Sequence, residues 1–125
     1  MTTPPRSDKS ILIVDDDFDV RDLLTLVLKS SGYQTVGVSN GQEALSHLRR
    51  SNPPAVILLD LIMPVMDAWE FRQLQQGDPA LGAIPVVLLS ATEEIIEHGK
   101  ALQASAFIRK PIDFGVLLET VGRYC

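Results

Sequence analysis

Short apolar runs alternate along this chain with segments of helical periodicity, and this alternation limits the possible folds more than any other feature. The runs cover residues 11–14, 35–38, 55–60, 85–89 and 106–108. Several of them are almost continuously apolar, which is typical of parallel strands that helices cover on both faces. Five such strands alternating with five helices predict a doubly wound α/β sandwich of three layers around a parallel sheet.

The segments between the runs carry apolar side chains at helical spacing. Within residues 20–27 they fall at positions i, i+3, i+4 and i+7, and residues 41–48 and 114–121 repeat this spacing. Asn40 and Asp113 stand directly before the second and the last of these stripes, where an N-cap residue belongs. The sequence therefore predicts three well-defined amphipathic helices.

Two further helices are expected where the pattern is weaker. One lies near residues 69–75 and ends before Gly77. The other begins after Thr92 and is the weakest of the five; it contains Ile95, Ile96 and Leu102. Gly32 follows the first helix, at the place of a left-handed stop residue.

Length and composition predict one folded domain. The chain has 125 residues, of which 46% are apolar, and its net charge is -5. This charge argues against direct nucleic-acid binding, since phosphate backbones need clustered Lys and Arg. The longest apolar runs are far too short for membrane insertion, and no secretory signal opens the chain, so we expect a cytoplasmic protein. Residues 1–9 are expected to form a flexible tail before a single domain at residues 10–125.

Chemically active side chains follow four of the five predicted strands. Asp15 and Asp16 follow the first strand, Asp60 ends the third, Ser90 follows the fourth, and Lys110 comes just after the fifth. In open α/β sheets the functional site lies outside the carboxyl ends of the strands. These carboxylates, the hydroxyl and the ammonium group are therefore expected to meet at one edge of the sheet.

This set of groups suits phosphoryl transfer assisted by Mg2+. Clustered carboxylates repel one another unless a cation compensates them, and oxygen ligands suit a hard divalent ion. Such an ion neutralises charge during in-line phosphoryl transfer. A lysine adds a second positive charge, a serine hydroxyl can hydrogen-bond a phosphoryl oxygen, and an aspartate can act as the nucleophile that forms an acyl phosphate.

The order of these motifs resembles that of response-regulator receiver domains, the phosphoacceptor modules of two-component phosphorelays. The resemblance rests on residues 14–17, on Asp60 with residues 63–67, on Ser90 with its following alanine, and on the Lys110-Pro111 pair. It runs from about residue 11 to the end of the sequence. Each motif alone is weak, but all four in order are a strong signal. The resemblance implies a flavodoxin-like (βα)5 fold with strand order 2-1-3-4-5.

The resemblance also implies a role for each residue of the site. Asp60 would accept the phosphoryl group. Asp16 and Asp60 would bind Mg2+ directly, Asp15 would act through water, and the backbone carbonyl of Ile62 would supply one further ligand. Lys110 would contact the phosphoryl group, and the peptide bond between it and the following proline would be cis.

Two residues would form the switch. Ser90 would follow the phosphoryl group and draw the loop after the fourth strand inward. Phe107 stands where the family has its switch aromatic and would swing inward with that movement. An aromatic ring in a strand can equally be core packing, and both interpretations of Phe107 stay open.

The implied function is a signalling switch and not an enzyme, because the domain would catalyse only its own phosphorylation and dephosphorylation. A sensor histidine kinase or a histidine phosphotransfer protein would supply the phosphoryl group, and a downstream protein target would respond. An alternative is a degenerate receiver that docks to a partner without phosphorylation. A Mg2+-dependent phosphatase would leave Asp60 unexplained, and a flavodoxin-like cofactor binder would not place acidic residues after the first strand.

Three departures from the family pattern bear on these expectations. Ala68 replaces a glycine, so the loop after Asp60 is expected to have a different shape. Gln103 replaces the glycine that is common before the fifth strand. The stretch from residue 90 to residue 110 is about two residues shorter than usual, which predicts a short or irregular fourth helix.

Overall fold

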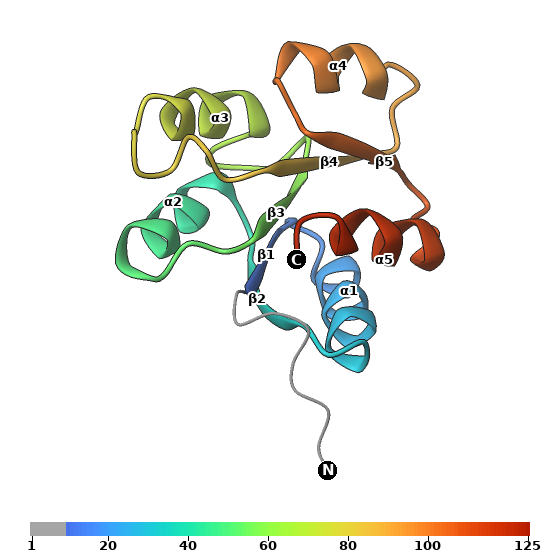
Figure 1. Ribbon diagram of the computed structural model, residues 1–125. Coiled ribbons are helices and arrows are strands. Elements are labelled where there is room, and N and C mark those ends of the chain that lie inside the picture. The colour runs from blue at the N-terminus through green and yellow to red at the C-terminus, as the bar shows by residue number, and fades with distance from the viewer. Residues whose placement is uncertain (1–9) are drawn as a thin grey trace.

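In the computed structural model, which describes residues 10–125, five parallel strands alternate with five helices (Figure 1). The predicted tail at residues 1–9 lies outside the described residues. The strands are β1 Ser10–Val14, β2 Gln34–Val38, β3 Val56–Asp60, β4 Val86–Ser90 and β5 Ala106–Arg109. The helices are α1 Phe18–Ser30, α2 Gly41–Arg50, α3 Ala68–Gln76, α4 Ile95–Ala101 and α5 Phe114–Gly122. The sheet order is β2-β1-β3-β4-β5, which confirms the predicted doubly wound fold.

Alternation along the strands builds two separate cores. In β1, Leu12 and Val14 pack on the face covered by α2, α3 and α4, whereas Ile11 and Ile13 pack on the face covered by α1 and α5. Figure 1 shows the two groups of helices on opposite sides of the sheet. Because β1, β3 and β4 lie inside the sheet and are covered on both faces, almost every residue in them is buried.

Four helices begin at aspartate or asparagine caps. Asp17, Asn40, Asp67 and Asp113 each accept a hydrogen bond from a backbone N–H in the first turn of the helix that follows. This confirms the two caps predicted at Asn40 and Asp113. Helix α4 differs, because its capping position holds Glu94, which makes no side-chain cap bond, and the helix has only 7 residues. The prediction of a short fourth helix is confirmed.

A buried polar network ties α3 to the end of α4. The guanidinium of Arg72 donates from Nε to the carbonyl of Leu102 at 2.9 Å and from its two NH groups to the side chain of Gln75 at 2.7 Å and the carbonyl of Gln103 at 2.9 Å. Gln75 in turn donates to two carbonyls of the turn between α3 and β4. Since each donor has a partner, this network fixes the C-terminal end of α4.

Three described residues have a left-handed backbone. Gly32 has φ 94°, at the end of α1 where the sequence predicted it. Gln103 has φ 56°, a backbone conformation that glycine adopts without strain but that is unfavourable for a residue with a side chain. In the loop after β3 the left-handed residue is Val65, with φ 68°, while Ala68 is the buried first residue of α3. Among residues 10–125, none of the helices has the length and apolar character needed to cross a membrane.

Candidate functional site

The side chains predicted to form the site meet at the carboxyl edge of the sheet. Carboxylate oxygens of Asp15, Asp16 and Asp60 lie within 4.8 Å of one another. The ammonium of Lys110 lies 2.9 Å from Asp15 Oδ2 and 3.2 Å from Asp60 Oδ1. The backbone N–H of Lys110 also donates to the carbonyl of Ser90 at 2.8 Å, so the strands carry all five residues to one place.

Asp15 is held at every polar atom and is fully buried. Its backbone N–H donates to the carbonyl of Val38, and its own carbonyl accepts a bond of 2.8 Å from Arg21 NH1. Its Oδ1 accepts the backbone N–H of Asp17 at 2.9 Å, and its Oδ2 accepts Lys110. Both carboxylate oxygens of Asp15 therefore already have partners, and its side chain is held in a fixed position beside the site.

Asp16 and Asp60 present the carboxylate oxygens that are still available. Asp16 is exposed, and its side chain makes no hydrogen bond to any residue between 10 and 125. Asp60 is largely buried and is bound by Lys110 at one oxygen. Burial, and after it the negative charge of Asp15, raise the pKa of Asp60 to about 6, although Lys110 acts in the opposite direction. The cluster therefore carries negative charge that one lysine does not fully compensate.

Neighbouring groups fix both the side chain and the backbone of Lys110. Burial would lower the pKa of the Lys110 ammonium, but the hydrogen bond with Asp15 and the charge of Asp60 outweigh burial and raise it. The ammonium thus stays protonated between the two carboxylates. The bond between Lys110 and Pro111 is cis, as the resemblance implied.

Ser90 ends β4 beside the acidic cluster and is buried. Its hydroxyl oxygen accepts the backbone N–H of Thr92 at 3.1 Å, so the hydroxyl proton remains able to point at an acceptor. The Thr92 hydroxyl itself donates to Glu94 at 2.6 Å.

The remaining predicted residues lie around this centre. Ile62, whose carbonyl is the expected additional metal ligand, is 75% exposed. Phe107 is 41% exposed and does not belong to either core. Its ring packs on Gly99 of α4, where an added Cβ would lie 2.9 Å from a ring carbon.

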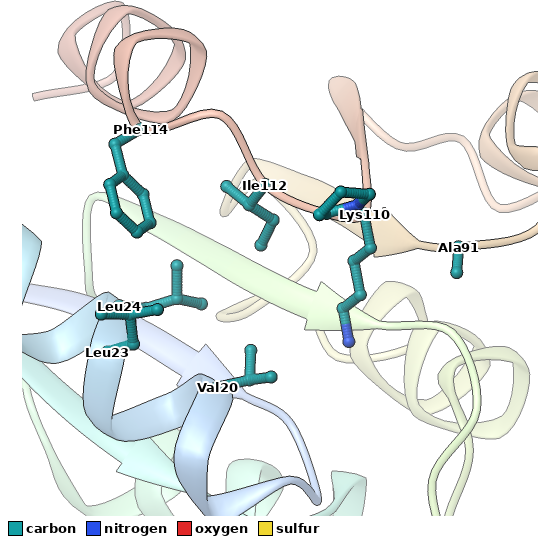
Figure 2. Close-up of a pocket in the computed structure, with 8 residues that line it drawn as sticks. Val20, Leu23, Leu24, Ala91, Lys110, Ile112 and Phe114 are labelled. Atoms are coloured by element: carbon teal, nitrogen blue, oxygen red, sulfur yellow. The ribbon is translucent and has the colours of Figure 1, made fainter.

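An apolar pocket of about 420 Å3 adjoins the site between α1 and the loop from β5 to α5 (Figure 2). In Figure 2 the Lys110 side chain runs along one wall of this pocket toward the sheet edge. The lining side chains are almost all apolar: Val20, Leu23, Leu24, Ala91, Pro111, Ile112 and Phe114 join Lys110.

Two contacts near the site could not be found from sequence patterns. Arg21 reaches back from the second turn of α1 to the carbonyl of Asp15. Gly41 donates its N–H to the carbonyl of Met66 at 3.1 Å, and a Cβ on Gly41 would lie only 2.9 Å from the Met66 side chain. No motif marks either contact, since both depend on how the helices and loops are placed in space.

Comparison with known proteins agrees with this geometry. Residues 11–122 match the response regulator receiver domain family. Protein PilH of Pseudomonas aeruginosa is 31% identical over 90% of this chain and 93% of its own length. The polar-differentiation response regulator DivK of Brucella anthropi is 34% identical over 93% and 95%. The structure of Vibrio cholerae chemotaxis protein CheY4 superposes with a TM-score of 0.84 at 28% identity and covers 95% of this chain and 100% of that one.

The chain belongs to the response regulator receiver domain family. It is a signalling module of phosphorelays, and its fold is that of the chemotaxis regulators.

Proposed function

We propose that Asp60 is the phosphoacceptor of this receiver and that a sensor histidine kinase or a histidine phosphotransfer protein supplies the phosphoryl group. The observation that carries the proposal is the position of Asp60, largely buried, bound by Lys110 at one oxygen and facing the acidic cluster. Asp15 is already bound at both carboxylate oxygens, and Asp16 has no ammonium partner among residues 10–125. Asp60 is thus the carboxylate best placed to act as nucleophile.

The donor set fits Mg2+. Its ligands would be Asp16 and Asp60 directly, Asp15 through water, and the carbonyl of Ile62. All these donors are oxygens, and a hard divalent cation would stabilise the ionised Asp60, whose pKa is raised by burial and then by the negative charge of Asp15. When bound, Mg2+ would supply positive charge for the oxygens of the transferred group.

The side chains then account for the transfer step. A carboxylate oxygen of Asp60 attacks phosphorus, the bond from phosphorus to the donor nitrogen breaks, and its electron pair leaves with the donor. Lys110 stands where it can neutralise a phosphoryl oxygen, and the hydroxyl of Ser90 can donate to another. The domain catalyses only its own phosphorylation and dephosphorylation.

The switch follows from the same bonds. A phosphoryl group on Asp60 offers a stronger acceptor to the Ser90 hydroxyl than any group near it in the unphosphorylated domain. Drawing Ser90 toward it would move Thr92, whose backbone is bonded to Ser90. Phe107, half exposed against α4, would turn inward as α4 moves, and a downstream protein target would bind the altered surface.

A protein phosphodonor needs a docking surface beside Asp60, and the apolar pocket beside Lys110 supplies one (Figure 2). Leu23 lines it and is 47% exposed, and Phe18 at the start of the same helix is 66% exposed. Leu23→Asp should lower phosphotransfer from a protein donor at least tenfold and leave phosphorylation by acetyl phosphate within about twofold. Equal loss with both donors would contradict this role.

The direct test follows intact mass during incubation with acetyl phosphate and Mg2+, with Asp60→Asn as control. The parent should gain one phosphoryl group, a chelator should prevent the gain, and the control should gain none. A phosphoryl group on the Asp60→Asn protein would disprove the assignment. Failure of the parent to react with acetyl phosphate or with any histidine kinase would favour a phosphorylation-independent docking module.

A further inference from the structure

Arg21 makes a contact that no role proposed above uses. It lies in α1, and its NH1 donates to the backbone carbonyl of Asp15 at 2.8 Å. We propose that Arg21 is a positioning residue for the Mg2+ site, and that this bond sets the direction in which the Asp16 carboxylate points. The inference rests on the proposed function, because it concerns the same metal site.

The peptide plane carries the effect from one residue to the next. The carbonyl of Asp15 lies in the planar peptide unit that ends at the Cα atom of Asp16. Holding the carbonyl oxygen therefore holds the orientation of that whole unit. This matters for Asp16, because its exposed side chain has no hydrogen bond to residues 10–125 that could hold it in place. The Asp15 side chain already has its own partners, so Arg21 acts mainly on the neighbouring residue.

Arg21 is itself held in one position. Its aliphatic stem crosses β2 at Gly37, where an added Cβ would lie 3.5 Å from the Arg21 Cδ atom. Its guanidinium lies 5.5 Å from the centre of the Phe18 ring. Its charge also contributes to lowering the pKa of Glu43, after the hydrogen bonds that Ser39 makes to that carboxylate. A side chain fixed at its stem and its head can transmit a fixed geometry.

The charge of Arg21 and its hydrogen bond have opposite effects on Mg2+ affinity. A positive charge close to the site repels a divalent cation, so removing the charge alone would tighten binding. Removing the hydrogen bond would loosen the loop that carries Asp16 and weaken binding. The direction of the change in Kd therefore tells the two roles apart.

The test is a calorimetric Mg2+ titration of the full chain at fixed ionic strength. Arg21→Met keeps the stem and removes both charge and donor, and should raise the Kd about fivefold, the effect of one ordinary hydrogen bond. Arg21→Lys keeps an ammonium donor and should recover part of the loss. Lys29→Met, which removes one exposed charge at the far end of the same helix, should leave the Kd unchanged.

Phosphorylation by acetyl phosphate gives a second readout. In Arg21→Met the Mg2+ concentration for half-maximal rate should rise by the same factor, while the rate at saturating Mg2+ stays within about twofold of the parent. Gly37→Val, whose two methyl groups extend beyond a Cβ that would already be in van der Waals contact with the stem of Arg21, should displace Arg21 and shift the half-saturation in the same direction. This variant keeps the test valid should Arg21→Met fold poorly.

The outcomes distinguish failure of the positioning role of Arg21 from failure of the proposed Mg2+ site. An unchanged or lower Kd in folded Arg21→Met, with normal Mg2+ binding by the parent, would overturn this inference and leave the proposed function intact. A parent that binds no Mg2+ would overturn the proposed metal site and this inference together.

Discussion

The two loops that flank the acidic cluster are held very differently. The loop from β1 to α1 is fixed by bonds to other elements, since Asp15 is bound by Val38, Arg21 and Lys110 as well as by its own loop. The loop from β4 to α4, residues 91–94, bonds mainly to itself, with one exposed link of 3.3 Å from Arg109. A switch needs both kinds of loop, one that keeps its geometry and one that can move at low cost.

The two ends of α4 repeat this difference. The N-terminal end has no side-chain cap and follows the loop that bonds mainly to itself, whereas the C-terminal end is held by the buried guanidinium of Arg72. Movement of Ser90 would therefore displace the beginning of α4 more than its end. The comparison yields four predictions, taken from the largest expected effect to the smallest.

Loss of Arg72 should destabilise the domain most. Arg72→Leu leaves the carbonyls of Leu102 and Gln103 and the side chain of Gln75 without a donor, and should lower the free energy of unfolding by about 2–4 kcal/mol. Urea denaturation measures the change. Arg49→Leu, at an exposed position of α2, should cost less than about 0.5 kcal/mol. Equal losses of unfolding free energy in the two variants would show that Arg72 does not anchor the C-terminal end of α4.

Neutralising Asp60 should stabilise the domain when no divalent cation is present. The folded-state pKa of about 6 lies above the ordinary 3.8, so ionisation of Asp60 costs stability above pH 6, and this cost disappears as the pH falls toward 4. Asp60→Asn should therefore be more stable than the parent by about 1 kcal/mol at pH 7, after allowance for solvent screening, with little difference near pH 4.

Mg2+ should reverse that order. At ten times the parent's Kd, Mg2+ should stabilise the parent by about 1.4 kcal/mol and the variant, which lacks the Asp60 carboxylate, by less than about 0.4 kcal/mol. Urea titrations at pH 4 and pH 7, with and without Mg2+, measure both effects. A variant less stable than the parent at pH 7 without Mg2+ would contradict the raised pKa.

Relief of the strained backbone at Val65 should give a smaller gain. A β-branched residue at φ 68° is unfavourable, and Val65 is 72% exposed, so little packing is lost on replacement. Val65→Asn should raise the free energy of unfolding by about 0.5–1 kcal/mol. The same change at Val116, an exposed helical position, should give no gain. A loss of stability at Val65 would show that the loop needs valine there.

The smallest effect is expected at Gly99. Alanine favours the helix by about 1 kcal/mol, but its Cβ would press on the Phe107 ring, so Gly99→Ala should change stability by less than about 0.5 kcal/mol. With Phe107→Ala already present, the same change should give close to the full gain. A double-mutant cycle by urea denaturation measures this coupling. Equal effects in both backgrounds would show that the ring does not rest on Gly99.

Much of the fold and of the site could be predicted from the sequence because both depend on strand ends. A buried parallel strand is recognisable as an apolar run, and the residue after it must lie at the carboxyl edge, which placed Asp15, Asp60 and Lys110 together. The short α4 was expected because the chain between Ser90 and Lys110 is short.

Other features depend on three-dimensional placement and left no pattern. Arg72 occupies a buried position on α3 that a hydrophobic stripe would assign to an apolar residue, and its partners lie about 30 positions away. From the sequence alone Arg21 would be expected to be a solvent-exposed charge, because the rotation of α1 over β2 leaves no sequence pattern. In the loop after Asp60 the left-handed residue is Val65, which no sequence pattern marked, whereas Ala68, the departure from the family pattern, is the first residue of α3.

The most direct test of the contrast between fixed and mobile loops is residue-by-residue NMR of the backbone amides, before and after phosphorylation with excess acetyl phosphate and Mg2+. Phosphorylation is predicted to shift residues 90–98 and Phe107 strongly, and residues 17–21 and 102–103 much less. Asp60→Asn under the same conditions should show neither change. Equal shifts in both groups, or larger shifts in residues 17–21, would contradict the account.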